Sequence, residues 1–197
     1  MAVFFMDITQ TPKPMRLETA VIDSSALSGY KISPSPCRGC PNFGRRWACP
    51  PFDTPPAELF SLDAKIVLAA VLVEPQKNLS PLQCVEAARK IYDEIFYEVE
   101  RLFPGCRILL AGSCVCPLSQ NCPRISGEKC AFEDRRRMSL ESLSYNVVKI
   151  CRDFLGFEVL WAKGENQPSY YTLEYAVVTD NMSAQNIQNF IKDSIRP

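Results

Sequence analysis

Two short stretches of the sequence concentrate its cysteines. The first contains three cysteines at C-x2-C-x8-C spacing between prolines, and the second contains four. Neither stretch has the apolar period of a helix or a strand, so each is expected to form a loop that presents sulfur atoms. Thiols gathered in this way are suited to binding a metal. The candidate metal ligands are Cys37, Cys40, Cys49, Cys114, Cys116, Cys122 and Cys130.

The composition narrows the chemistry that these cysteines can support. The chain has 197 residues, ten cysteines and no histidine. A Ser-His-Asp triad, a Cys-His nucleophile pair and an HExxH zinc site are therefore excluded, and any metal must be held mainly by thiolates. The other three cysteines, Cys84, Cys106 and Cys151, lie in apolar patterns and are expected to be core residues.

Thiolate ligation restricts the metal to zinc or iron–sulfur. Cys37-x2-Cys40 resembles one knuckle of a zinc site, but Cys114-x-Cys116 is a poor second knuckle. An iron–sulfur cluster of the 4Fe–4S type accepts looser spacing, and cysteine followed by proline recurs at such sites. We therefore favour an iron–sulfur cluster and keep Zn2+ as the alternative. Unligated loop thiols are disfavoured because free cysteine prefers burial.

Basic residues accompany both cysteine stretches although the net charge is zero. Residues 24–52 contain four bases and no acid, and residues 106–137 contain six bases and three acids. Positive charge favours thiolates and an anionic metal complex. The alternative is a basic surface loop without such a role.

Trp47, Arg135 and Arg137 are candidate cofactor-contacting residues. Trp47 lies with Phe43 and Phe52 in the first stretch, where aromatic rings could cover the metal. The alternative is a stacking platform for single-stranded nucleic acid, which the zero net charge disfavours. The arginines could donate hydrogen bonds to cluster sulfurs, bind an anionic partner, or be exposed without a role.

The pattern around the cysteines predicts an α/β fold, an α+β sandwich in which helices pack on a mixed β-sheet. The apolar run Ile66–Val73 predicts a strand buried on both faces. Ser80 and Gln83 form a capping box that begins a helix ending before Pro104. The other predicted elements are strands at 17–22, 107–111, 157–161 and 170–178, and helices at 54–60, from Ser139 to Gly156, and after Ser183.

We expect one domain over residues 1–197. It would have an irregular segment at 1–35 and two loops, the first cysteine loop (36–52) and the second cysteine loop (112–134). Neither a signal-peptide pattern nor an apolar stretch of membrane-spanning length is present, so a cytoplasmic location is expected. In that compartment clustered cysteines are metal ligands or redox thiols rather than disulfides.

Both cysteine stretches resemble the motifs of a known family. One motif is C-x2-C…G-x2-W-x-C-P-P, formed by residues 37–51, and the other is G-x-C…C…G-x-x-C running into S-x-E, formed by residues 112–141. This pattern resembles the "predicted metal-binding protein" family, domain of unknown function 2284. The resemblance covers residues 37–147 and implies metal binding, with no established reaction. The spacing Cys114-x-Cys116-x5-Cys122 is longer than the family's usual C-x2-C-x2-C.

Three functions fit these observations. The favoured one is an iron–sulfur protein that transfers electrons or supports a redox protein partner, with basic loops that dock an acidic surface or tune the cluster. The second is a zinc-stabilised module that binds protein or nucleic acid. The third is a metal-dependent enzyme with an open metal position at the three-cysteine motif. We expect neither a nucleic-acid partner nor a membrane partner.

Overall fold

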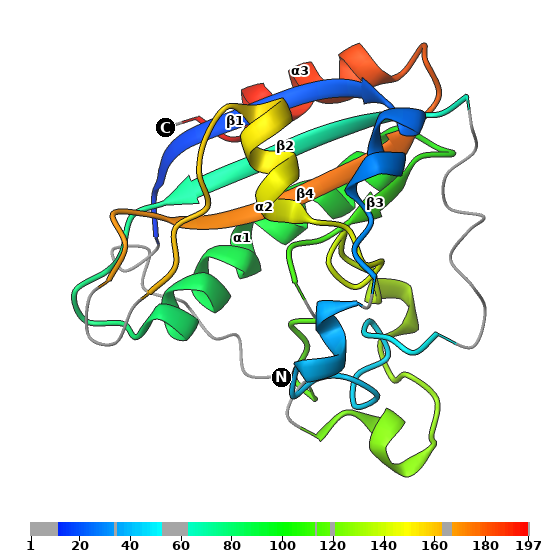
Figure 1. The fold of residues 1–197 in the computed structure, drawn as a ribbon, viewed down its shortest axis with the longest axis vertical. Coiled ribbons are helices and arrows are strands. Elements are labelled where there is room, and N and C mark those ends of the chain that lie inside the picture. The colour runs from blue at the N-terminus through cyan, green and yellow to red at the C-terminus, as the bar shows by residue number, and fades with distance from the viewer. Residues whose placement is uncertain are drawn as a thin grey trace.

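The chain folds around a four-stranded β-sheet (Figure 1). The structure is a computed structural model, and it describes residues 12–33, 35–52, 63–112, 114–118, 121–162 and 167–196. The strand order is β1-β2-β4-β3, and every neighbouring pair is antiparallel. The strands are β1 (Pro14–Asp23), β2 (Lys65–Val73), β3 (Arg107–Leu109) and β4 (Tyr171–Thr179).

The predicted α/β sandwich is confirmed, but its sheet is antiparallel where a mixed sheet was expected. β2 and β3 run in the same direction and are joined through a helix, as in a parallel unit. β4 lies between them and pairs with both, so the two parallel strands never meet. This arrangement is a split β–α–β unit.

The apolar run predicted as a buried strand is β2, and its residues 66–73 are all buried. Side chains alternate across a strand, so β2 supplies two cores. Val67 and Val71 face one core, and Leu68 and Leu72 face the other. This double burial explains why the sequence of β2 is continuously apolar.

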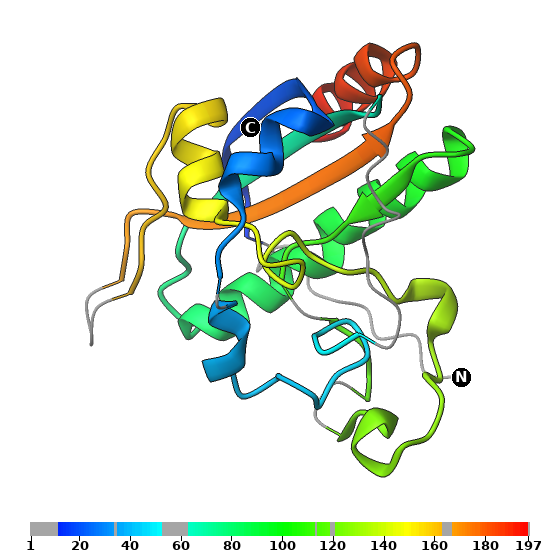
Figure 2. The same cartoon turned by 45° about the vertical axis from the view of Figure 1, so that its right-hand side comes forward.

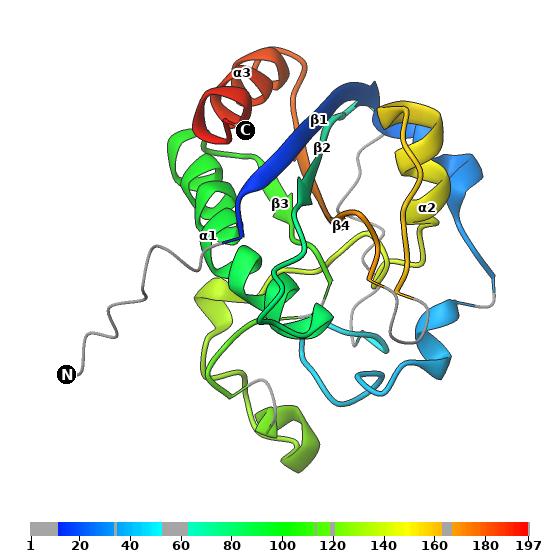
Figure 3. The ribbon, with the colours of Figure 1, turned by 90° about the vertical axis from the view of Figure 1, so that its left-hand side faces the viewer.

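Helices cover both faces of the sheet (Figure 3). α1 (Pro81–Leu102) and α3 (Ala184–Ser194) pack on one face. The other face is covered by α2 (Val147–Ile150), which continues as a π-helical turn, and by a 3-10 segment over Ser24–Tyr30. No helix in the described ranges has the combined length and apolarity that a membrane span would need.

The prediction that a helix begins at Ser139 is wrong. The Ser139 hydroxyl does accept a backbone N–H, but from Ser142 at 3.1 Å, and this closes a turn instead of a helix. Ser144 then adopts φ +68°, which no helix allows, and α2 begins after Asn146. The predicted end is confirmed, because Gly156 has φ +74°.

Two other predictions differ from the structure, and a third lies outside the described residues. Residues 157–161 form no strand, and Phe157 instead turns inward and packs edge-on against Tyr170. The N-terminal segment is more regular than expected, because β1 takes ten residues. The helix predicted at 54–60 lies outside the described residues.

Replacing Ser80 with alanine should destabilise the protein by about 1 kcal/mol. The Ser80 hydroxyl accepts the Gln83 N–H at 3.3 Å, and the Gln83 side chain accepts the Ser80 N–H at 2.9 Å. Ser183→Ala is the matched control, because Ser183 precedes α3 but makes no side-chain capping bond. Urea unfolding would measure both variants. Equal losses of stability would contradict this role for Ser80.

Candidate metal centre

The two cysteine loops lie side by side at one end of the molecule, beyond the sheet (Figures 1 and 2). The described cysteines are all free thiols. Three of them, Cys84, Cys106 and Cys151, are buried in the two cores, which confirms the prediction that they are core residues. The other seven lie in the loops or at their edges.

Backbone hydrogen bonds fold the first cysteine loop into a compact unit. The Cys40 N–H donates to the Cys37 carbonyl at 2.9 Å, and the Asn42 N–H donates to the Cys40 sulfur at 3.5 Å. Gly44 has φ +69°, a conformation that favours glycine, and its N–H donates to the Pro50 carbonyl at 2.8 Å. These bonds return the chain on itself, so the residues of the C-x2-C-x8-C motif stay close together.

The four candidate ligands of the second cysteine loop line a single cavity, here called the cysteine cavity. Arg46 and Trp47 of the first cysteine loop complete its wall together with Phe132. A strand end delivers Cys114 to this place, because β3 stops at Leu109. The cysteines that line the cysteine cavity are Cys114, Cys116, Cys122 and Cys130.

The Cys114 thiol of the second cysteine loop affects the pKa of Cys49 in the first, so the thiols of the two loops interact electrostatically. Burial raises the pKa of Cys49 most, and together with the nearby thiols of Cys114, Cys40 and Cys37 it brings that pKa to about 12. Burial also raises the pKa of Cys114, to which Cys116 adds a smaller effect. The thiols of Cys49 and Cys114 are therefore protonated at neutral pH, and a bound metal would displace their protons.

The described cysteines do not form a ready-made site for a single ion. Among the residues that the structure describes, no three Cys, Asp or Glu side chains stand close enough to hold one ion. The Cys37 thiol instead donates to the Glu141 carbonyl at 3.3 Å. The donor set is thus the right type for a soft metal, and four of its cysteines line the cysteine cavity.

Arg124 fastens the second cysteine loop to the first, and the sequence did not single it out. Its guanidinium donates to the carbonyls of Arg46 at 2.8 Å and Cys49 at 2.5 Å, and also to Pro51. It also lies over the Trp47 ring, 5.2 Å from the centroid. The available signal was an arginine directly after a Cys-Pro pair, although this pattern alone does not reveal a partner.

Trp47 lies in the wall of the cysteine cavity, and its predicted contact with a cofactor stays a prediction. Its indole N–H donates to the Glu128 carbonyl at 3.0 Å, and the guanidinium groups of Arg124 and Arg136 lie over its ring. Trp47 belongs to the first cysteine loop, whereas Glu128 and Arg124 belong to the second. Trp47 therefore packs between the loops as a cover for the cavity.

Arg135 and Arg137 both reach α1. Arg137 donates to Glu100 at 2.9 Å, and Arg135 pairs with Glu94 and lies over the Tyr97 ring. Both arginines also line a second small cavity, together with three of the candidate metal ligands, Cys114, Cys116 and Cys130. Their predicted contact with a cofactor stays a prediction, and their ion pairs tie the end of the second cysteine loop to α1.

Replacing Arg124 with alanine should loosen the first cysteine loop, because three carbonyls lose their donor. Limited proteolysis should cut residues 36–52 about tenfold faster than in the unmodified protein. Arg45→Ala is the matched control, since Arg45 is an exposed arginine of the first cysteine loop, the loop whose cleavage is measured. If both variants are cut at the same rate, Arg124 does not fasten the loops.

Comparison with known families supports metal binding in general. The family model described as "Predicted metal-binding protein (DUF2284)" matches residues 21–174, which include both cysteine loops. Neither the curated proteins nor the solved structures gave a match. The matched region covers most of the chain, from β1 into β4. The protein therefore belongs to the DUF2284 family of predicted metal-binding proteins.

Proposed function

We propose that the cysteine loops hold an iron–sulfur centre of the 4Fe–4S type and that the protein transfers electrons or supports a redox partner. The observation that carries the proposal is that four cysteines of the second cysteine loop line one small cavity, beside Arg46 and Trp47 of the first. Its ligands would be Cys114, Cys116, Cys122 and Cys130. A bound cluster would supply one-electron redox chemistry.

A cluster and a single ion place different demands on the positions of the ligands. Four thiolates around one zinc ion, at Zn–S of ~2.3 Å, must lie about 3.8 Å from one another. A 4Fe–4S cluster distributes its four thiolates over four irons, so its ligands surround a larger volume. The described residues contain no ready-made site for one ion, which is closer to the second requirement.

The surroundings suit an anionic cluster. Arg46 lines the cavity and donates to the Cys114 carbonyl at 3.3 Å, and Arg124 lies close by on the same loops. Nearby positive charge stabilises thiolates and the complex that they form. The exposed Arg38 and Arg45 lie within the first cysteine loop and would attract an acidic redox protein in the cytoplasm.

A zinc-stabilised binding module is the second candidate, and the first cysteine loop favours it. The Cys37–Cys40 turn, with the Asn42 N–H directed at the Cys40 sulfur, has the form of a zinc knuckle. Cys49 and Cys114 are the neighbouring thiols that could complete four ligands. In this case the metal would hold the two loops together for a protein partner.

Protein purified without oxygen should be brown and contain iron and acid-labile sulfide in equal amounts. This follows because a 4Fe–4S cluster contains one sulfide for each iron. Metal analysis, sulfide assay and an absorption spectrum would measure it. Colourless protein with stoichiometric zinc would reject the iron–sulfur centre and favour the zinc module.

Serine substitutions would identify the ligands. Cys122→Ser and Cys130→Ser should each weaken metal retention against a chelator by more than about tenfold, because each removes a thiolate from the centre. Cys84→Ala is the control, since Cys84 lies on the core-facing side of α1 and not in either cysteine loop. Retention that is unchanged in both serine variants would show that the metal is not held in the cysteine cavity.

A further inference from the structure

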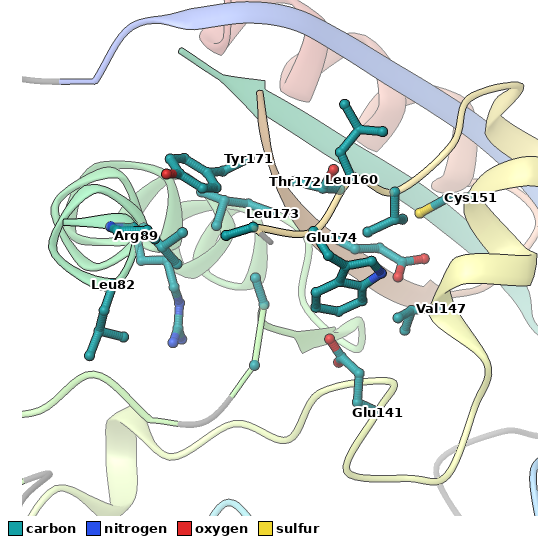
Figure 4. A pocket seen from close by; sticks show the side chains of 17 residues that line it. Leu82, Arg89, Glu141, Val147, Cys151, Leu160, Tyr171, Thr172, Leu173 and Glu174 are labelled. Atoms are coloured by element: carbon teal, nitrogen blue, oxygen red, sulfur yellow. The ribbon is translucent and has the colours of Figure 1, made fainter. Parts of the chain in front are cut away.

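A cavity of about 420 Å3, here called the β4 cavity, lies along the first half of β4 (Figure 4). β3 pairs with β4 only at Ala176–Val178. Within the described residues, the earlier part of β4 therefore has no strand neighbour on this side. Residues 159–162 and α1 form walls there instead. This volume falls in the range of pockets that bury small organic ligands.

The walls of the β4 cavity are mostly apolar. They come from α1, from the start of α2, from residues 159–162 and from β4 itself. Trp161 lies at this wall with 67% of its surface exposed, which places an aromatic ring at the opening. The apolar wall residues include Leu82, Val85, Val147, Val159, Leu160 and Leu173.

Glu174 is the exception, and it is buried with 7% of its surface exposed. Neither of its carboxylate oxygens has a hydrogen-bond partner in the described part of the chain, and the same holds for the Tyr171 hydroxyl and Thr172 Oγ1. The Cys151 thiol does interact with the carboxyl, but a thiol is a weak donor, so the described residues give this carboxyl no N–H or O–H donor. A buried polar group without a partner costs about 1–3 kcal/mol, and more when it is charged.

A second carboxyl increases the need for a cation. Burial raises the pKa of Glu174 well above its ordinary value, and the neighbouring Glu141 raises it further. Figure 4 shows these two side chains at one end of the cavity and Arg89 at the other. Arg89 is ion-paired with Asp93 at 3.0 Å, so its charge is already balanced on α1.

We propose that the β4 cavity binds a small organic cation, with an apolar body against the cavity walls and an ammonium group that donates to Glu174. An ammonium group supplies hydrogen-bond donors to the Glu174 carboxylate, and its positive charge balances the negative charge of that carboxylate. Trp161 at the opening suits the same class of ligand, because an aromatic face attracts cations. A carboxylate ligand would instead lie against two carboxyl groups, neither of which offers it a positive charge.

Three probes of nearly equal size test this directly: 2-phenylethylamine, neutral 2-phenylethanol and anionic phenylacetate. Calorimetry on the full chain should show the amine binding most tightly and phenylacetate most weakly. Glu174→Gln should weaken amine binding by about tenfold or more, because it removes the charge from the acceptor. The same variant should leave binding of the alcohol within about twofold, since a neutral donor gains little from that charge.

Two further variants complete the design. Glu158→Gln makes the same chemical change at an exposed position and should leave all three affinities unchanged. Val159→Trp fills the cavity and should weaken the amine and the alcohol alike. If the amine binds no better than the alcohol, if no probe binds, or if Glu174→Gln leaves amine binding unchanged, the proposal is wrong.

This experiment is separate from the test of the metal centre. The probes bind through Glu174 and apolar walls, and none of the proposed metal ligands lines the β4 cavity. Iron and sulfide analysis of Glu174→Gln should therefore match that of the unmodified protein. Failure of the amine to bind would leave the iron–sulfur proposal standing, and colourless protein would leave the amine proposal standing.

Discussion

The nine-residue antiparallel ladder between β2 and β4 is the constraint on which the structure depends. β2 is buried along almost its whole length, so its backbone groups must be satisfied within the sheet. Alternating side chains then create an apolar surface on each face, and each surface requires a helical cover. α1 and α3 cover one face, α2 covers the other, and the edge of β4 beyond β3 is left for a cavity.

The cysteine loops are built on a different principle. They contribute few side chains to either core, and polar contacts hold them to each other and to the body of the protein. Arg124 reaches three carbonyls of the first loop, and Arg137 ties the second loop to Glu100 on α1. Such contacts stabilise less than apolar burial does. A metal centre would therefore supply a large part of the order at this end of the molecule.

The sequence predicted what depends on local pattern. β2 and α1 were readable because an apolar run and a capping box specify their own structures, and the three core thiols followed from their apolar neighbours. Ser139 misled because its hydroxyl makes the same kind of bond in a turn as at a helix start. The strand order, the neighbourhood of Cys114 and the reach of Arg124 depend on contacts between distant segments, which no local pattern encodes. Glu174 did leave a trace, as one acid within an apolar strand.

The turn at Leu140–Ser144 touches both proposed sites. The Glu141 carbonyl accepts the Cys37 thiol proton, while its side chain lines the β4 cavity. In the zinc-stabilised alternative, where Cys37 would bind the metal as a thiolate, that proton leaves, and the sulfur then faces a carbonyl oxygen without a hydrogen between them. The turn must adjust, and its adjustment is felt by Glu141 at the wall of the β4 cavity. Loading of the centre and occupancy of the cavity would then be linked equilibria, each altering the other by the same factor.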